Sequence, residues 1–234
     1  MKPAAFTYHR PATVDQAVDL LAELAPRDGR VLAGGQSLVP IMAFRLARPA
    51  HLIDINRVAG LDRLDVQDGQ LRIGARVRHA AFHRPVEDGP LGALLAAVVR
   101  HIAHYPIRLR GTFCGSLAHA DPAAEWCLVA AALDAKLVAV STRGRRILSA
   151  HDFFHGAMQT ALQPDELLAE VRTTHAYAGL TDAQWRWALD FVVKGGASLK
   201  AYPEYQRVVP DSDGVYRVPD RAIAHIAWIS GLML

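Results

Sequence analysis

The sequence predicts an α+β protein made of two α/β subdomains, followed by an abridged C-terminal region. Three observations lead to this prediction. The 234 residues are 51% apolar and 21% charged, a composition that can form a buried core. Helical and strand-like periodicities alternate along most of the chain. Beyond residue 182 the periodicity is poor until residue 221. The two subdomains are predicted to span residues 1–57 and 58–175, and the C-terminal region residues 176–234.

The first subdomain is predicted to contain two helices and two strands. Thr13 and Gln16 have the spacing of a capping box, and apolar residues then recur at helical spacing up to Leu24. A short β-type run, Arg30–Ala33, leads directly into two glycines. The remaining elements are a helix and a buried strand: Leu38–Leu46 and His51–Ile55.

A β-hairpin opens the second subdomain, because strand-like residues flank Asp68-Gly69, a dipeptide typical of two-residue turns. Pro90 opens an apolar helix that runs to about Ile102. Asp121 is expected to cap another helix that ends near Leu133. Three further strands are predicted: Lys136–Ser141, Arg145–Leu148 and Leu167–Arg172. A linker and a β-like run are expected after them: Thr173–Asp182 and Arg221–Ile229.

The composition restricts the possible functions. A net charge of +3 without a basic stripe is weak evidence for nucleic-acid binding and suits an anionic cofactor equally well. Cys114 and Cys127 lack the C-x-x-C spacing of zinc and iron–sulfur sites, so no metal is expected in this chain. The sequence shows no signal peptide and no membrane span, and a cytoplasmic location is expected.

The first candidate site is Ala33-Gly34-Gly35-Gln36-Ser37-Leu38, between a predicted strand and a predicted helix. Its two glycines allow a left-handed backbone and the close approach of a ligand. The amides of such a turn can bind an anion such as a diphosphate, and Gln36 and Ser37 can add side-chain donors. The pattern matches neither G-x-G-x-x-G nor a P-loop, which argues against both of those nucleotide sites. Taken alone, such a pattern is more often only a tight turn.

The second candidate site is residues 110–125. Four small or hydroxyl-bearing residues there offer accessible backbone amides: Gly111, Thr112, Gly115 and Ser116. Asp121 and Glu125 flank a predicted helix start, where a carboxylate can accept hydrogen bonds from sugar hydroxyls or from the helix amides. From the sequence alone, helix capping is the favoured role of Asp121.

Together, the two segments resemble the paired flavin loops of the medium subunits of the xanthine dehydrogenase / carbon monoxide dehydrogenase family. The resemblance rests on Ala33–Pro40 and Gly111–Pro122, in the order and at the spacing found in that family, and it covers residues 1–172. Supporting matches are His51–Ile55, Ile73–Ala75 and Leu162–Leu168. The resemblance implies a PCMH-type (vanillyl-alcohol-oxidase-like) FAD-binding fold of two α/β subdomains with an abridged C-terminal subdomain.

Carried over position by position, the resemblance also implies which residues bind FAD. Both segments would hold the diphosphate through backbone amides: Ala33, Gly34, Gly35, Gln36, Ser37 and Leu38 in the first, and Thr112, Phe113, Cys114, Gly115 and Ser116 in the second. Asp121 or Glu125 would lie near the ribose and adenine, and Ile102 near the adenine. Leu168 would lie near the isoalloxazine ring, and Glu166 would order that strand or the edge of the flavin.

The function implied by the resemblance is that of an FAD-binding electron-transfer subunit in a molybdenum hydroxylase complex. The molybdenum–pterin centre would belong to a large partner subunit and the [2Fe-2S] clusters to a small one, in a dimer of heterotrimers. Electrons would pass from those clusters through FAD to NAD, a quinone or oxygen. No catalytic acid or base is expected in this chain.

The sequence departs from the family pattern in two places. Cys114 stands where many relatives have glycine, and it is interpreted as a packing residue because no base is paired with it. After Arg172 the pattern is largely lost, which predicts an abridged or altered third subdomain.

Three other functions remain open at this stage. A truncated structural subunit without flavin, or a non-functional homologue, would be colourless when purified. A self-sufficient flavin oxidase is less favoured, because no His or Tyr near the two segments suggests a base or covalent flavin attachment. Nucleic-acid binding ranks last.

Overall fold

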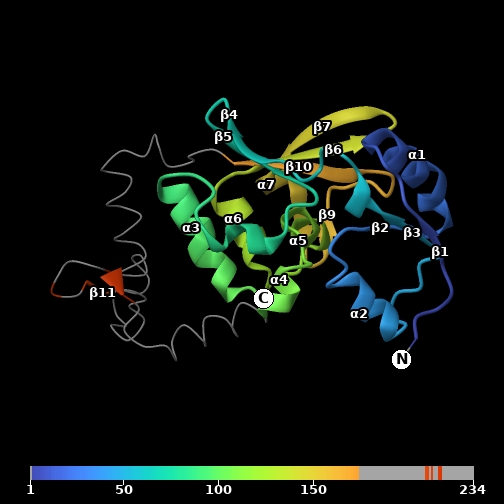
Figure 1. Cartoon of the computed structure of the whole chain (residues 1–234), viewed down its shortest axis with the longest axis horizontal. Coiled ribbons are helices and arrows are strands. Elements are labelled where there is room, and N and C mark those ends of the chain that lie inside the picture. Colours follow the sequence, from blue (N-terminus) through green and yellow to red (C-terminus); the bar gives the residue numbers. More distant parts are fainter. Residues whose placement is uncertain (1, 174–208, 211, 213–215, 218–234) are drawn as a thin grey trace. The chain divides into compact units, whose positions relative to one another are not determined.

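The computed structural model of the chain describes residues 2–173, 209–210, 212 and 216–217 (Figure 1). The chain divides into two compact units, Met1–Ala176 and Tyr177–Leu234. In the second unit, β11 (Val209–Pro210) pairs with β12 (Tyr216–Arg217) in antiparallel fashion. All other elements described below belong to the first unit.

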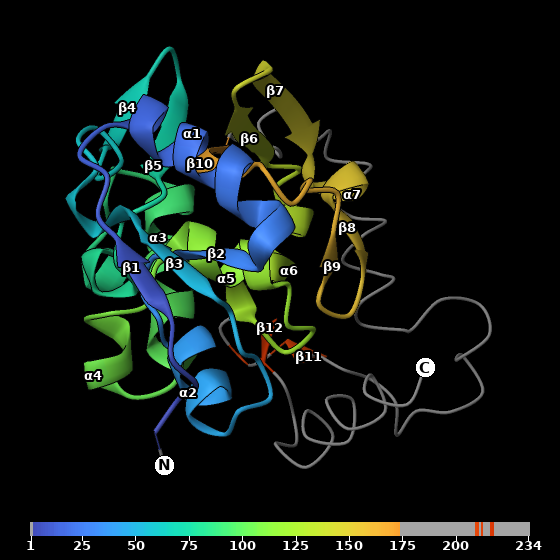
Figure 2. The ribbon, with the colours of Figure 1, turned by 90° about the vertical axis from the view of Figure 1, so that its right-hand side faces the viewer.

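A three-stranded parallel sheet forms the N-terminal part, with β1 (Thr7–His9), β3 (His51–Asp54) and β2 (Gly29–Leu32) in that spatial order (Figure 2). The predicted strands are confirmed to within one residue. Strand β1 was missed, because its three residues are largely exposed and show no apolar alternation.

Helix α1 (Val14–Leu24) joins β1 to β2 and confirms the predicted helix. The Thr13 hydroxyl accepts a hydrogen bond from the Gln16 amide at 3.2 Å, and the Gln16 side chain accepts one from the Ala12 amide at 2.8 Å. The buried face of the helix packs against β2 and β3 of this sheet and against β6 (Lys136–Ser141) of a second sheet. This face consists of Ala17, Val18, Leu21 and Leu24. After β2, helix α2 (Leu38–Ala43) is shorter than predicted, because Arg45 adopts a left-handed backbone with φ 59°.

The second sheet has five antiparallel strands in the order β4-β5-β10-β6-β7, which are Leu64–Gln67, Gln70–Gly74, Leu167–Thr173, Lys136–Ser141 and Gly144–Ser149. Asp68 and Gly69 both have positive φ in the turn between β4 and β5, which confirms the predicted hairpin. The central strand, β10, pairs with β5 on one side and β6 on the other. The strands of the two sheets lie within the two predicted subdomains, and the boundaries at 57/58 and 175/176 remain predictions.

Helices α3 to α6 lie together below the five-stranded sheet in Figure 1. The short helices of this layer are α3 (Pro90–Val98), α4 (Tyr105–Arg108), α5 (Phe113–His119) and α6 (Glu125–Ala132), with 3-10 turns η3 (His79–His83) and η4 (Val99–His101). The rest of the unit comprises η1 (Ala25–Arg27), η2 (Ile55–Arg57), α7 (Ala150–Phe153), β8 (Phe154–Gly156) and β9 (Gln159–Thr160).

An aromatic cluster connects turn η3 with helices α5 and α6. Phe82, Phe113 and Trp126 are fully buried, with ring centroids 4.7 to 5.5 Å apart. Tilted aromatic contacts of this kind contribute about 0.5–1.5 kcal/mol each beyond the burial of their area. Because Phe113 belongs to the second candidate segment, the cluster ties that segment to the core.

Some predictions about the second subdomain and the residues after it were wrong, and others lie outside the described residues. Asp121 does not cap a helix: α6 begins at Glu125, and the Asp121 carboxylate instead accepts a hydrogen bond from the Ala123 amide at 2.9 Å, closing a turn. The second candidate site, residues 110–125, was compared with a flavin loop, but its residues 113–119 form helix α5. Thr173 belongs to β10 and not to a linker. The remainder of the predicted linker and the β-like run at 221–229 lie outside the described residues.

Candidate functional site

The candidate site lies at the carboxyl edge of the three-stranded sheet. Ala33 follows the last residue of β2, and Ile55–Arg57 follows the last residue of β3. Because the strands are parallel, both connections leave the sheet at the same edge, where open α/β sheets bind their ligands.

Residues 33–38 are called the first glycine segment. Gly35 has φ 72°, in the left-handed region, and the Gln36 side chain donates to the Gly34 carbonyl at 3.0 Å. Within the described part of the chain, no group accepts a hydrogen bond from the backbone amides of residues 34–37. Consecutive unpaired amides at a turn are suited to bind an anion. This geometry therefore fits a diphosphate.

Residues 111–116 are called the second glycine segment, and most of their amides already have partners. Thr112 caps α5, because its hydroxyl accepts from the Gly115 amide at 3.1 Å. The Ser116 amide donates to the Thr112 carbonyl, and the Phe113 amide donates to Val77 at 3.0 Å. This segment thus has fewer amides available for an anion than the first.

The side chain of Cys114 is directed into the core and is 2% exposed, with its sulfur 3.5 Å from the Ile73 carbonyl oxygen. Burial, and then the charge of Glu170, raise the pKa of this thiol. These observations confirm the interpretation of Cys114 as a packing residue.

The two glycine segments touch, although they are far apart in the sequence. A Cβ atom added to Gly34 would lie 2.5 Å from the Arg110 carbonyl oxygen and 2.6 Å from the Gly111 Cα. A Cβ added to Gly115 would lie 3.9 Å from the Ala33 Cβ. Helices α2 and α4, which flank these segments, lie near each other in both views (Figures 1 and 2). Gly34 is therefore required for this close approach and not only for a turn.

The His79 side chain packs against Gly111 of the second glycine segment, and the sequence analysis had not singled it out. Its imidazole would be 2.5 Å from a Cβ on Gly111, and its Nδ1 accepts a hydrogen bond from the Trp126 indole at 2.9 Å. Burial, followed by the charges of Arg78 and Arg108, lowers the pKa of His79 to about 4. The neutral ring therefore carries its proton on Nε2.

Asn56 and Arg78 also reach the junction of the two segments and were missed. Asn56 donates to the Ala33 carbonyl at 2.8 Å, and Arg78 donates to the Arg110 carbonyl. A polar residue two positions after the end of β3, at the same edge as the first glycine segment, was a usable signal for Asn56. No local pattern marks Arg78, because its partners are distant in the sequence.

The structure places the other predicted cofactor residues in different surroundings. The Ile102 and Leu168 side chains belong to the hydrophobic core, with 8% and 4% exposure. Asp121 and Glu125 lie close enough to Cys127 that their charges, added to burial, raise the pKa of its thiol to about 12. No role of these four residues in cofactor binding follows from the geometry alone.

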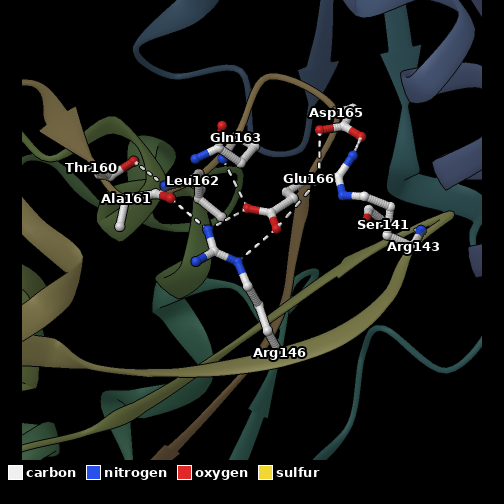
Figure 3. A network of polar contacts seen from close by, with 9 residues as sticks. All are labelled: Ser141, Arg143, Arg146, Thr160, Ala161, Leu162, Gln163, Asp165 and Glu166. Atoms are coloured by element: carbon white, nitrogen blue, oxygen red, sulfur yellow. Dashed lines mark hydrogen bonds and ion pairs between the residues drawn. The ribbon is translucent and has the colours of Figure 1, made fainter.

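Glu166 is bound on both carboxylate oxygens by groups of the protein (Figure 3). Arg146 donates to the two oxygens at 2.7 and 2.6 Å, and the Gln163 amide donates to one of them at 2.8 Å. The neighbouring Asp165 pairs with Arg143. Burial would raise the pKa of Glu166, but these hydrogen bonds and the two arginine charges lower it overall. The arrangement favours the strand-ordering role over a contact with the flavin edge.

Among the described residues, no group of three His, Cys, Asp or Glu side chains is placed to hold a metal ion. No helix in the same part of the chain is long and apolar enough to cross a membrane.

Comparison with known proteins shows extensive similarity over the first unit. The family model described as "FAD binding domain in molybdopterin dehydrogenase" matches residues 4–173. The chain is 44% identical over 171 residues to the nicotine 6-hydroxylase medium subunit of Paenarthrobacter nicotinovorans, covering 73% of this chain and 60% of the relative. It is 41% identical to the caffeine dehydrogenase subunit beta of Pseudomonas sp. (strain CBB1), covering 74% and 58%.

A solved carbon monoxide dehydrogenase from Hydrogenophaga pseudoflava has a similar fold, with a TM-score of 0.71 and 38% identity over 74% of this chain and 60% of that one. The chain thus spans about 60% of the length of these three proteins. A second family model, the winged helix domain of large helicase-related proteins, matches residues 153–231. It covers about a third of the chain, and its beginning overlaps β8 to β10, which belong to sheets of the first unit.

Proposed function

The chain belongs to the family of FAD binding domains in molybdopterin dehydrogenases, and on this premise we propose that it is the FAD-binding electron-transfer subunit of a molybdenum hydroxylase complex. One observation carries the proposal beyond family membership. The first glycine segment presents four consecutive amides without acceptors among the described residues, directly against the second glycine segment. Such a cradle is complementary to the diphosphate of FAD.

The residues of this chain would bind and orient the cofactor. Backbone amides of residues 34–37 would hold the diphosphate, and the second glycine segment would close the cradle from the other side. Asp121 or Glu125, Ile102 and Leu168 are proposed to lie along the rest of the cofactor, with Glu166 ordering the start of β10. The bound flavin supplies the ability to exchange electrons singly or in pairs, between iron–sulfur clusters and an acceptor such as NAD, a quinone or oxygen.

The finer features of the proposal follow from the family. We propose a PCMH-type, vanillyl-alcohol-oxidase-like fold, a cytoplasmic location, and assembly with a large molybdopterin-binding subunit and a small [2Fe-2S] subunit as a dimer of heterotrimers. The medium subunit named among the relatives and the similar carbon monoxide dehydrogenase structure support this assignment.

The first test is the absorption spectrum of the purified chain, alone and after incubation with FAD, compared with two glycine variants. Gly35→Asp places a carboxylate in the first glycine segment and should abolish the flavin spectrum by charge repulsion. Gly69→Asp is the matched control, since Gly69 has the same φ of 72° but lies in a hairpin turn with no atom within 4 Å of the added Cβ.

Flavin retained by Gly69→Asp and lost by Gly35→Asp, with circular dichroism unchanged, would support the proposal. A native chain that stays colourless with FAD would favour a structural subunit without flavin. Substrate turnover by the isolated flavin-loaded chain would instead indicate a self-sufficient oxidase.

A further inference from the structure

Asn56 is held in a defined orientation beside the first glycine segment. Its backbone amide and its side-chain Nδ2 both donate to Asp54 Oδ1, at 2.8 and 2.6 Å. Nδ2 also donates to the Ala33 carbonyl at 2.8 Å. Because Nδ2 faces two acceptors, the side-chain oxygen of Asn56 must face the other way. That oxygen is directed toward Arg78.

Arg78 completes a bridge between the two glycine segments. One terminal nitrogen of its guanidinium donates to Asn56 Oδ1, and the other donates to the Arg110 carbonyl, next to Gly111. The same Arg110 oxygen is the atom that leaves no room for a Cβ on Gly34. A continuous path of hydrogen bonds therefore runs from Ala33 through Asn56 and Arg78 to Arg110, parallel to the direct contact.

The charge of Arg78 is not neutralised by an ion pair within the described residues. Its nearest charged neighbours include two more cations, Arg76 and Arg110, and burial together with these charges lowers its pKa, while Asp54 acts in the opposite direction. A half-buried guanidinium among other cations is unfavourable unless an anion comes close. The unpaired amides of the first glycine segment lie on the same junction.

We propose that Asn56 and Arg78 are positioning residues of the cofactor site, which set the separation of the two glycine segments and place a positive charge beside the diphosphate. The inference rests on the proposed function, because it takes the bound anion to be the diphosphate of FAD. Neither residue is proposed to take part in electron transfer. Their effect is on the affinity for FAD and on the stability of the junction.

The bridge itself is tested without FAD by a double-mutant cycle. Asn56→Leu and Arg78→Met each break the path, so each should lower the urea midpoint of unfolding. The urea midpoint of the double variant should fall by less than the sum of the two single decreases, since the second substitution removes an interaction that the first has already broken. Additive midpoints would show that the two side chains do not act together, and the inference would fall.

The charge is tested by titrating the same variants with FAD at low and high salt. Either change should raise the FAD dissociation constant by about tenfold or more, as expected for the loss of a charge-assisted contact. Only Arg78→Met should also flatten the salt dependence, because Asn56→Leu leaves the charge in place. Arg76→Met is the matched control: it removes a neighbouring cation that is bonded to the Val58 carbonyl and not to either segment.

The outcomes separate the two proposals. A native chain that takes up no FAD overturns the proposed function and the charge effect together, while the cycle still decides whether the bridge exists. Normal FAD binding by the native chain, with Arg78→Met no weaker than Arg76→Met, overturns the inference alone. Weakened, salt-insensitive binding in Arg78→Met together with a non-additive cycle supports it.

Discussion

Replacing Gly34 by alanine should force the two glycine segments apart. The new Cβ would lie 2.6 Å from the Gly111 Cα, whereas carbon atoms in contact are about 3.5–4.0 Å apart, so one backbone must move by about 1 Å. Both backbones are held by hydrogen bonds, to Asn56 on one side and to Arg78 on the other. Overpacking of this kind costs about 1–3 kcal/mol. We therefore expect Gly34→Ala to lower the free energy of unfolding by that amount.

The same displacement should weaken FAD binding by about tenfold or more, because the amides of the first segment lose their alignment and each 1.4 kcal/mol corresponds to a factor of ten. Urea unfolding followed by circular dichroism measures the first effect, and quenching of FAD fluorescence measures the second. Gly156→Ala is the control, since its Cβ would meet nothing nearer than Gln159 at 3.7 Å. If Gly34→Ala is as stable and binds FAD as tightly as this control, the close approach of the segments is not what Gly34 provides.

Three further predictions concern buried polar groups. The pKa of His79 is lowered from 6.5 in the unfolded chain to about 4 in the folded one. As the pH falls from 6.5 to 4, the unfolded chain therefore binds a proton before the folded chain does, and the free energy of unfolding should fall by about 3 kcal/mol. Urea unfolding across this range should show the fall, and His79→Gln, which cannot titrate, should lack it. Glu166→Gln should destabilise the chain by about 1–3 kcal/mol, because Arg146 loses its charged partner, and the difference from native should shrink in acid as the lowered pKa of Glu166 is reached. Cys114 should resist a thiol reagent at neutral pH until the chain unfolds, which mass spectrometry of the labelled protein can check.

Local patterns predicted most elements of the first unit. The capping box of α1 and the Asp-Gly hairpin involve contacts between residues two to four positions apart, and the structure confirms both. The resemblance over residues 1–172 is confirmed by the family match over residues 4–173. The sequence failed where one residue type suits two local structures, a helix cap and a turn. Asp121 is a residue type that often caps helices, yet here its carboxylate closes a turn with the Ala123 amide, and α6 begins only at Glu125.

The amino-acid sequence was sufficient to identify the two glycine segments, because small residues in a fixed order are a local property that can be compared directly with a known family. Only the tertiary structure shows that Gly34 packs on Gly111 and that Asn56 and Arg78 converge on the junction. These contacts join residues that are separated by many positions along the chain, and they form only when β2, β3 and α5 come together around the buried core. The physical reason for the division is that local propensity depends on neighbours in sequence, whereas the geometry of the site depends on neighbours in space.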